Sequence, residues 1–332
     1  MTIFFISSPG QMAHRALSLI NKEKFKDLTI VTTKTIKPFF EDKLDAKILT
    51  LDVEPNLITK DTKHKLITNA IKSKFEYNKL FKHVKGQDVY LFFTSWGIVP
   101  ISYVKKLSKN NKVYLYPEDF LDNMYDEEKG LTALIMKLSA KLLLGLDVYI
   151  VRWNNIPVWE LKLNSFPMEI IEHDVFNNKL PKEFCIDPKY LKGKSILFLG
   201  SKFEIDCEES EDKIKLTNKL VNILDKHFKN KYCVKAHPID KILYGKMKNC
   251  KYIIPAHYLS ESLYNHYWDF IIGYHSEALV SAKRHTNAKV ISLVKLYDFT
   301  NPKVRQYWID TFDKEGLIMP KNLEELKCSL MI

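Results

Sequence analysis

The 332-residue sequence has few cysteines and lacks the common dinucleotide- and triphosphate-binding motifs. Its five cysteines form no CxxC pair and no metal-type spacing, so free thiols in a reducing cytosol are expected and a zinc site is not. GxGxxG and GxxxxGK(S/T) motifs are missing, which disfavours a dehydrogenase and a P-loop kinase. The sequence also has no internal repeat and no low-complexity segment.

Long apolar runs are missing as well. No stretch of about 20 apolar residues is present to cross a bilayer. No signal peptide is expected, because residues 1–6 run into a Ser-Ser-Pro turn without a basic segment before them. Residues 131–146, interrupted by Lys137 and Lys141, predict a helix with a broad apolar face. This face is either buried in a domain or lies in a membrane interface, and both interpretations stay open.

Charge and length define the class of protein more closely. Hydrophobic residues make up 46% of the chain and charged residues 27%, which indicates sizeable cores and, at this length, two domains. Lys and Arg number 51 against 40 Asp and Glu, for a net charge of +11 spread along the chain. Dispersed lysines either solvate the surface or favour polyanionic partners such as nucleotides or an anionic membrane. No zinc finger, helix-turn-helix or basic stripe supports binding to nucleic acid.

Apolar strand-type runs alternate with helical patterns in two sets, which is typical of parallel sheets wrapped by helices. Between the sets, residues 154–194 carry four prolines and little periodicity. We therefore predict a first domain at 1–155, a linker at 156–194, a second domain at 195–301 and terminal helices at 302–332. Two doubly wound domains in tandem imply a cleft between them. The predicted strands are 3–7, 28–33, 46–51, 89–94, 113–116 and 147–151, then 195–199, 232–235, 252–255, 270–273 and 289–293.

Two polar loops follow strands of the first predicted domain. Ser8, Pro9 and Gln11 form a turn that opens a helix, where backbone N–H groups can meet a polar ligand or simply be capped. Glu118 and Asp119 are adjacent carboxylates after a strand. Because adjacent acids repel each other's charge, a partly desolvated member can act as a general base, and the alternative is a solvated loop.

Two further loops follow strands of the second predicted domain. Pro238 pushes the preceding His237 into extended geometry at the carboxyl end of its strand, which is where ligands gather in open α/β sheets. An ordinary strand-end histidine is the alternative. Gly273, His275 and Ser276 combine a glycine, a hydroxyl and a helix N-terminus, a setting in which amides and the helix dipole hold a phosphate.

Taken in order, these loops resemble the motifs of the bacterial sialyltransferases and polysialyltransferases of the GT-B type. Glu118-Asp119 resembles the acidic motif of that family, and His237-Pro238 resembles its His-Pro motif. His275-Ser276 resembles its paired serine/threonine motif, with histidine in place of the first hydroxyl. Phe120 stands where the family has glycine.

Three further segments carry the resemblance. FFISSPGQ is similar to the start of the family, where a turn faces the acceptor. Residues 196–201 resemble the strand that opens its nucleotide domain, and Glu261 resembles a glutamate that contacts the nucleoside. The fold implied by the resemblance is GT-B, with two Rossmann-like doubly wound domains facing a central cleft and C-terminal helices crossing back.

The resemblance implies inverting transfer of sialic, legionaminic or pseudaminic acid from a CMP-activated donor to a sugar hydroxyl, without a metal or other cofactor. Glu118 is expected to be the base, with Asp119 as its substitute, and His237 to stabilise or protonate the departing phosphate. Trp96 either stacks on a sugar or is a partly buried tryptophan. The expected CMP-binding residues are Gly200, Ser201, Lys235, Pro238, Glu261, Gly273, His275 and Ser276, and the expected sugar contacts are Ser8, Pro9, Gln11 and Trp96.

The partners that follow are a nucleotide-sugar donor and a glycan acceptor, either lipooligosaccharide or capsule. A cytoplasmic protein that contacts the inner membrane peripherally is the setting we expect, and a homodimer is also considered. Two alternatives stay open: a GT-B transferase that uses CMP-Kdo, a UDP-sugar or a GDP-sugar, and a non-catalytic polyanion-binding protein.

Overall fold

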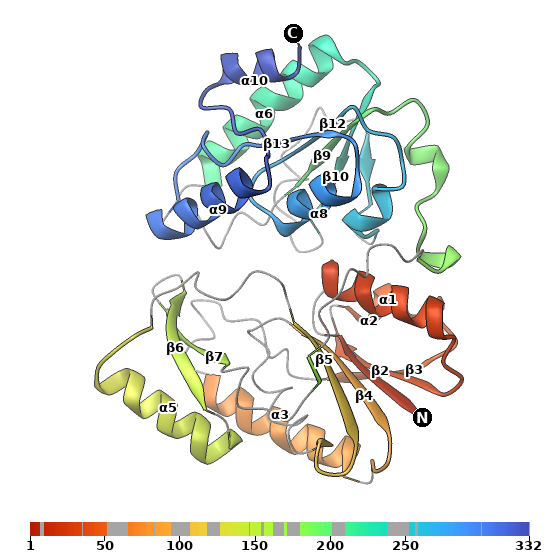
Figure 1. Ribbon diagram of the computed structural model, residues 1–332, viewed down its shortest axis with the longest axis vertical. Helices are drawn as coiled ribbons and strands as arrows, with labels where there is room; N and C mark the ends of the chain where they lie inside the picture. Colours follow the sequence, from red (N-terminus) through yellow and green to blue (C-terminus); the bar gives the residue numbers. More distant parts are fainter. Residues whose placement is uncertain are drawn as a thin grey trace. The chain divides into compact units, whose positions relative to one another are not determined.

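The computed structural model divides the chain into two compact units, residues 1–183 and 184–332. Figure 1 shows a parallel sheet with helices in each. The structure describes residues 1–6, 10–34, 36–51, 66–82, 84–93, 107–117, 127–145, 147–153, 156–161, 169–170, 180–200, 210–237, 252–255, 258–299 and 301–331.

Unit 1 contains a six-stranded parallel sheet in the order β3-β2-β1-β4-β5-β8. The sheet strands are β1 (Thr2–Ile6), β2 (Leu28–Thr33), β3 (Lys47–Leu51), β4 (Asp88–Phe93), β5 (Lys112–Pro117) and β8 (Glu169–Ile170). The helices described in this unit are α1 (Gln11–Glu23), α2 (Lys37–Phe40), α3 (Leu66–Phe81) and α5 (Leu131–Leu144).

The core of unit 1 is built on a ladder of aromatic rings across its central strands. Phe4 of β1 is fully buried, and its ring centroid lies 5.2 Å from that of Phe92 on β4. Phe92 in turn stacks on Tyr116 of β5, with the centroids 4.5 Å apart. Strands covered on both faces read as continuous apolar runs, as in β1, and β2 was predictable from its β-branched Ile, Val and Thr residues.

The segment at 156–194, which we expected to be a linker, contains ordered strands. β7 (Ile156–Leu161) pairs with β6 (Val148–Trp153) in an antiparallel hairpin, and β8 adds the sixth strand to the sheet of unit 1. Pro157 lies within β7, where a two-stranded hairpin tolerates a missing N–H donor. The division between the two compact units falls inside this segment, after Glu183.

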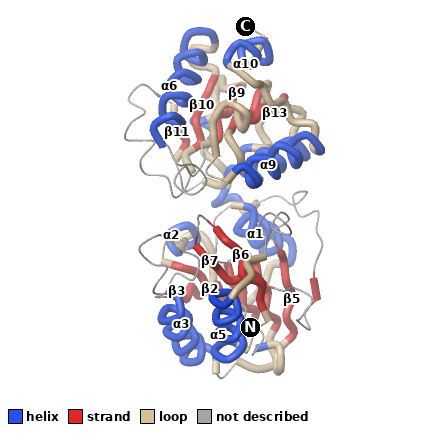
Figure 2. Tube along the Cα trace, turned by 90° about the vertical axis from the view of Figure 1, so that its left-hand side faces the viewer, coloured by secondary structure: helices blue, strands red, loops and turns tan. Residues whose placement is uncertain are grey.

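Unit 2 contains a five-stranded parallel sheet in the order β11-β10-β9-β12-β13. In Figure 2 the strands of this sheet lie between α6 and α9. The strands are β9 (Ile196–Leu199), β10 (Tyr232–Lys235), β11 (Ile253–Ile254), β12 (Phe270–Gly273) and β13 (Lys289–Ser292), and the helices described are α6 (Ser210–His227), α8 (Glu277–His285), α9 (Pro302–Lys314) and α10 (Leu323–Ser329).

The terminal helices α9 and α10 belong to unit 2. Trp308 of α9 is buried, with its ring centroid 5.8 Å from that of His275. Ile318, between the two helices, donates its N–H to the carbonyl of Val290 at 3.0 Å. These contacts attach α9 and the segment after it to the sheet of unit 2. The expected crossing toward unit 1 stays a prediction.

Candidate functional site

The strand order of unit 2 marks the position of a ligand site. The order runs outward from β9 in both directions, through β10 and β11 on one side and through β12 and β13 on the other. In such sheets ligands bind outside the carboxyl ends of the two strands at which the order reverses, here β9 and β12. Gly200 directly follows β9 and Gly273 ends β12, so these two predicted residues flank the switch point.

Lys235 ends β10 at the same edge and is 2% exposed. Its Nζ donates a hydrogen bond to the carbonyl of the next residue, Ala236. Burial lowers the pKa of the Lys235 ammonium to about 8, and the charge of Glu261 acts in the opposite direction. Glu261 lies in a short 3-10 turn, η6 (Ser260–Leu263), and is 6% exposed. Lys235 and Glu261, which we predicted independently as residues that bind the CMP donor, thus interact through their charges.

Tyr264, which we did not predict, connects the η6 turn to helix α8. Its hydroxyl donates to the carbonyl of Ala278 at 2.6 Å. Burial and the nearby charge of Glu261 both raise the pKa of Tyr264, so the phenol remains protonated and can act as the donor. The only sequence signal for this link is the spacing of three residues between Glu261 and Tyr264, which is one turn of a helix.

His237 lies two residues beyond the end of β10 and is half-buried. The chain is still paired just before it, because Ala236 donates its N–H to the carbonyl of Ile254 on β11. The imidazole therefore belongs to the carboxyl edge of the sheet and keeps some access to solvent. This position suits a group that exchanges protons with a ligand.

Helix α8 begins directly after β12, and Ser276 is its N-cap. The Ser276 hydroxyl accepts the N–H of Ala278 at 3.2 Å. A serine hydroxyl has one proton and two lone pairs, so the capping role leaves its O–H able to donate to an anion. Glu277 in the first turn already offsets part of the positive end of the helix dipole. Binding of a phosphate at this position would therefore require hydrogen-bond donors from side chains as well as the N-terminus of the helix.

Gly273 is explained by the packing of α8 onto the strand. A Cβ at this position would lie 3.0 Å from Cδ2 of Leu279, the third residue of α8. The glycine thus lets α8 approach the carboxyl end of β12 closely.

His275 is held in an aromatic cluster. Its Nδ1 shares a 2.5 Å hydrogen bond with the hydroxyl of Tyr297, and its ring centroid lies 4.8 Å from that of Phe299. The residue is buried. This environment gives His275 a packing role, and its predicted contact with an anion stays a prediction. Tyr297 was not identified from the sequence, because nothing local connects it to His275.

Several predicted residues cannot be assigned a place in the site. Gln11 begins α1 after Gly10, but its side chain is outside the described part of the structure. The predicted residues outside the described ranges are Ser8, Pro9, Trp96, Glu118, Asp119, Ser201 and Pro238.

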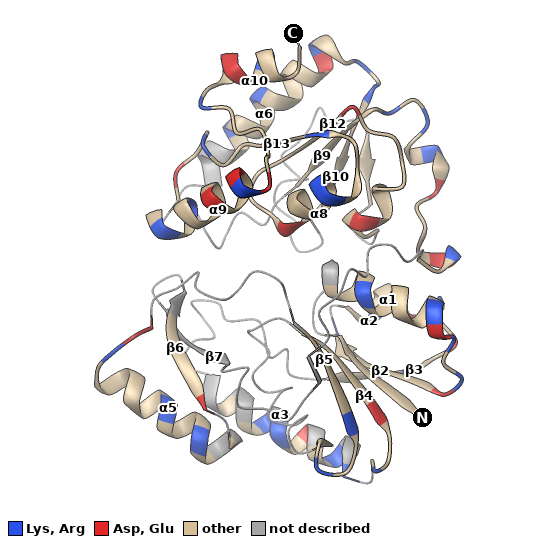
Figure 3. Ribbon diagram, in the orientation of Figure 1, with Lys and Arg blue, Asp and Glu red and all other residues tan. Residues whose placement is uncertain are grey.

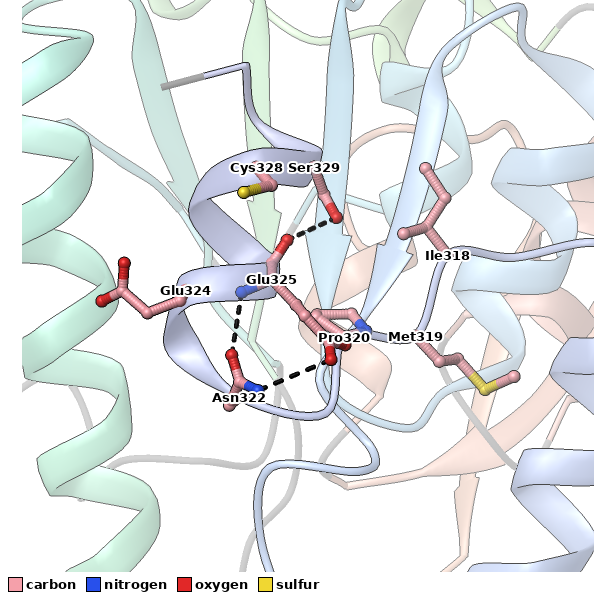
Figure 4. A pocket seen from close by; sticks show the side chains of 8 residues that line it. All are labelled: Ile318, Met319, Pro320, Asn322, Glu324, Glu325, Cys328 and Ser329. Atoms are coloured by element: carbon pink, nitrogen blue, oxygen red, sulfur yellow. Dashed lines mark hydrogen bonds between the residues drawn. The ribbon is translucent and has the colours of Figure 1, made fainter.

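A pocket of about 500 Å³ lies at another position in unit 2, against α10 (Figure 4). None of the predicted site residues lines it. Asn322 caps the helix by accepting the N–H of Glu325 at 2.9 Å, and Ser329 donates to the carbonyl of Glu325 at 2.8 Å. The polar groups of this pocket are therefore engaged in forming the helix. The described residues contain no His, Cys, Asp and Glu cluster suited to a metal ion.

No protein-family model matches the sequence, and comparison with curated proteins gave no significant match. Among solved structures, the UDP-GlcNAc 2-epimerase of Methanocaldococcus jannaschii is similar with a TM-score of 0.51 and 13% identity, over 100% of this chain and 92% of that one. A sialyltransferase from Photobacterium damsela is similar with a TM-score of 0.44 and 12% identity, over 96% of this chain and 81% of that one. The glycosyltransferase SnogD from Streptomyces nogalater is similar with a TM-score of 0.44 and 11% identity, over 100% of both chains.

Two parallel-sheet α/β domains with the same central strand order define the GT-B fold, and the fold class predicted from the sequence is confirmed. The similar structures include GT-B glycosyltransferases, a sialyltransferase among them. At these identities the likeness concerns the fold, so donor and acceptor must be argued from the residues.

Proposed function

We propose that the protein is an inverting glycosyltransferase that moves sialic acid or a related nonulosonic acid from a CMP-activated donor to a hydroxyl of a bacterial surface glycan. The observation that carries this proposal is the group of residues at the carboxyl edge of the unit 2 sheet. Lys235 ends β10 at this edge, and His237, Glu261 and the N-terminus of α8 follow strands β10, β11 and β12, which end there. The motif order in the sequence supports the CMP donor over other nucleotide sugars.

The phosphate of CMP is the group that this edge would hold. CMP offers a single phosphate, and charge develops on it as the sugar leaves. His237 is half-buried and can donate to the departing oxygen, and the Ser276 O–H can donate to a second oxygen. In this proposal these donors and the helix dipole replace the charge that a metal ion would otherwise supply.

The nucleoside would be held by Glu261. A carboxylate is an acceptor for ribose hydroxyls or for the exocyclic amine of cytosine, provided that it stays ionised although it is buried. The charge of Lys235 favours the ionised form. Since Lys235 is 2% exposed, its role in the proposal is to position and charge Glu261.

The proposed reaction is a single displacement. The acceptor oxygen bonds to the anomeric carbon, the bond from that carbon to the CMP phosphate breaks, and the acceptor proton passes to Glu118 or Asp119. Ser8, Pro9, Gln11 and Trp96 are proposed to contact the sugars. CMP leaves with the electron pair of the broken bond and takes a proton from His237 or from solvent.

The test is CMP release from CMP-Neu5Ac in the presence of sialic acid-free lipooligosaccharide, with and without EDTA. We expect release that depends on the acceptor, resists EDTA and falls at least about a hundredfold in Glu118→Gln or His237→Ala. His227→Ala is the matched control, because His227 is exposed at the end of α6. Acceptor-dependent release of UDP from a UDP-sugar would instead support the second candidate, for which the epimerase solved with UDP-GlcNAc and UDP is the precedent.

A further inference from the structure

Helix α5 of unit 1 presents five large apolar side chains to solvent. Each is between 50% and 82% exposed. We call this group the α5 leucine face, and it comprises Leu131, Leu134, Ile135, Leu138 and Leu142. The sequence allowed either burial of this apolar face in the domain or a position in a membrane interface, and the structure shows that these five side chains are exposed.

The leucine face is a single stripe along the helix. Its members follow Leu131 at intervals of 3, 4, 7 and 11 residues, which an α-helix brings onto one side. The opposite side carries Ala133 and Ala140, which are buried. Helix α5 lies against the β6–β7 hairpin, and five of its large apolar side chains face outward. A helix that serves only to cover a core has the reverse pattern.

Positive charge borders this stripe. Helix α5 contains Lys137 and Lys141 and no acidic residue, which Figure 3 shows as blue bands without red. Both lysines lie along one border of the leucine face by helical geometry. Lys137 pairs with Glu127, and Lys141 lies 3.9 Å from Asp147. These exposed pairs are weak in water and can rearrange near a stronger field.

Helix α3, which lies beside α5 in Figures 1 and 2, carries a similar combination. Phe75 is 71% exposed, an unusual position for a phenylalanine in a surface helix. Three exposed lysines share its side of the chain by helical spacing. Lys72 precedes Phe75 by three residues, and Lys79 and Lys82 follow it by four and seven. The exposed side of α3 therefore presents an aromatic ring among lysines.

We propose that α5 and α3 together form a surface by which unit 1 docks on an anionic lipid bilayer. Apolar stripes edged by lysine insert into the boundary between headgroups and acyl chains, while lysines are attracted to anionic headgroups. None of the described helices is long and apolar enough to span a membrane, so the contact proposed is a peripheral one. The inference goes beyond the proposed activity and does not depend on the donor sugar.

A second copy of the chain is the competing occupant of this face. A two-fold dimer through α5 and α3 would bring each patch against its own copy, and the lysines that border it would then face like charges. An anionic bilayer buries the leucines among its acyl chains and attracts the lysines to its headgroups. Charge therefore favours the bilayer over a second copy.

The test is flotation of the full chain with phosphatidylcholine vesicles that contain or lack phosphatidylglycerol, at low and high salt. Leu138→Glu combined with Leu142→Glu removes two members of the leucine face on adjacent turns. Lys72→Glu combined with Lys79→Glu reverses the charge around Phe75. The matched control is Tyr267→Ser, which removes a side chain in unit 2 that is 74% exposed. Thermal melting by circular dichroism verifies that each variant folds.

We expect the wild type to float with the anionic vesicles and to bind less at high salt. Both double variants should lose at least about tenfold in vesicle affinity, with the control unchanged. Failure of the wild type to bind anionic vesicles at low salt would overturn the proposal. Undiminished binding by the leucine variant would also overturn it, as would a lipid-free dimer that this variant dissociates. Nucleotide binding, measured on the same samples, reports on the proposed function separately.

Discussion

Lys235 and Glu261 are buried together at the carboxyl edge of the unit 2 sheet, and their charges are coupled. Burial lowers the pKa of the Lys235 ammonium to about 8, and the carboxylate opposes that change. Burying a charged lysine this deeply lowers the stability of the folded protein, and such groups are common at functional sites. In our account the purpose is to keep Glu261 ionised for a nucleoside.

The pH dependence of stability tests the lowered pKa of Lys235. Between a folded-state pKa of about 8 and the ordinary value of 10.5, the unfolded chain binds more protons than the folded chain. The wild type should therefore gain up to about 3 kcal/mol relative to Lys235→Met as the pH rises through this window. Urea denaturation of both proteins from about pH 7 to about pH 10.5 measures the difference. A difference independent of pH would mean that Lys235 titrates normally.

Glu261→Gln tests the coupling from the other side. Removing the carboxylate leaves the Lys235 ammonium buried without its compensating charge, so the free energy of unfolding near neutral pH should fall by about 3 kcal/mol. Glu324→Gln is the control, since Glu324 is largely exposed and pairs with Lys327 at the surface. It should change stability by less than about 1 kcal/mol. Equal effects of the two substitutions would argue against a buried pair.

Gly273→Ala tests the close approach of α8 to the sheet. The added methyl would meet Leu279 at 3.0 Å, and we expect a loss of about 2 kcal/mol. Leu279→Val withdraws the carbon atoms that clash, so the double variant should be more stable than the sum of the single changes predicts. Simple additivity in this double-mutant cycle would show that the glycine is there for another reason.

Tyr297→Phe separates the two roles of His275. The substitution keeps the ring and removes the hydroxyl that is bonded to Nδ1, so stability should fall by about 1 kcal/mol. If His275 acts by packing, CMP affinity should change by less than about threefold. A tenfold loss of affinity with unchanged stability would make His275 a direct ligand of the phosphate.

Much of the fold could be predicted because its strands are covered on both faces. Residues 196–199 and 270–273 are uninterrupted apolar runs, and the structure has β9 and β12 at these positions. Strands β7 and β8 were missed because Pro157 and the prolines that follow resemble a linker, although a hairpin strand accepts a proline. Proline argues against a central strand but not against a strand at an edge or in a hairpin, so residues 156–161 can form β7.

The site was predictable only as a set of strand ends. Parallel strands all finish at one edge, and so Lys235, His237 and Gly273 could be grouped before the structure was known. The coupling of Lys235 to Glu261 and the bond of His275 to Tyr297, which is 22 residues away, arise from tertiary packing and have no local signal. The sequence of α5 predicted a broad apolar face but did not decide whether that face is buried, because apolar residues lie on more than one side of the helix.

The most direct test of the account is calorimetric titration of the purified protein with CMP, UMP, UDP and GDP in the absence of metal, together with His237→Ala and His227→Ala. We predict that CMP binds selectively, that His237→Ala weakens CMP binding at least about tenfold and that His227→Ala leaves it unchanged. Preference for UDP or GDP, or binding of no nucleotide at all, would contradict the assignment of a CMP-sugar donor to the carboxyl edge of unit 2.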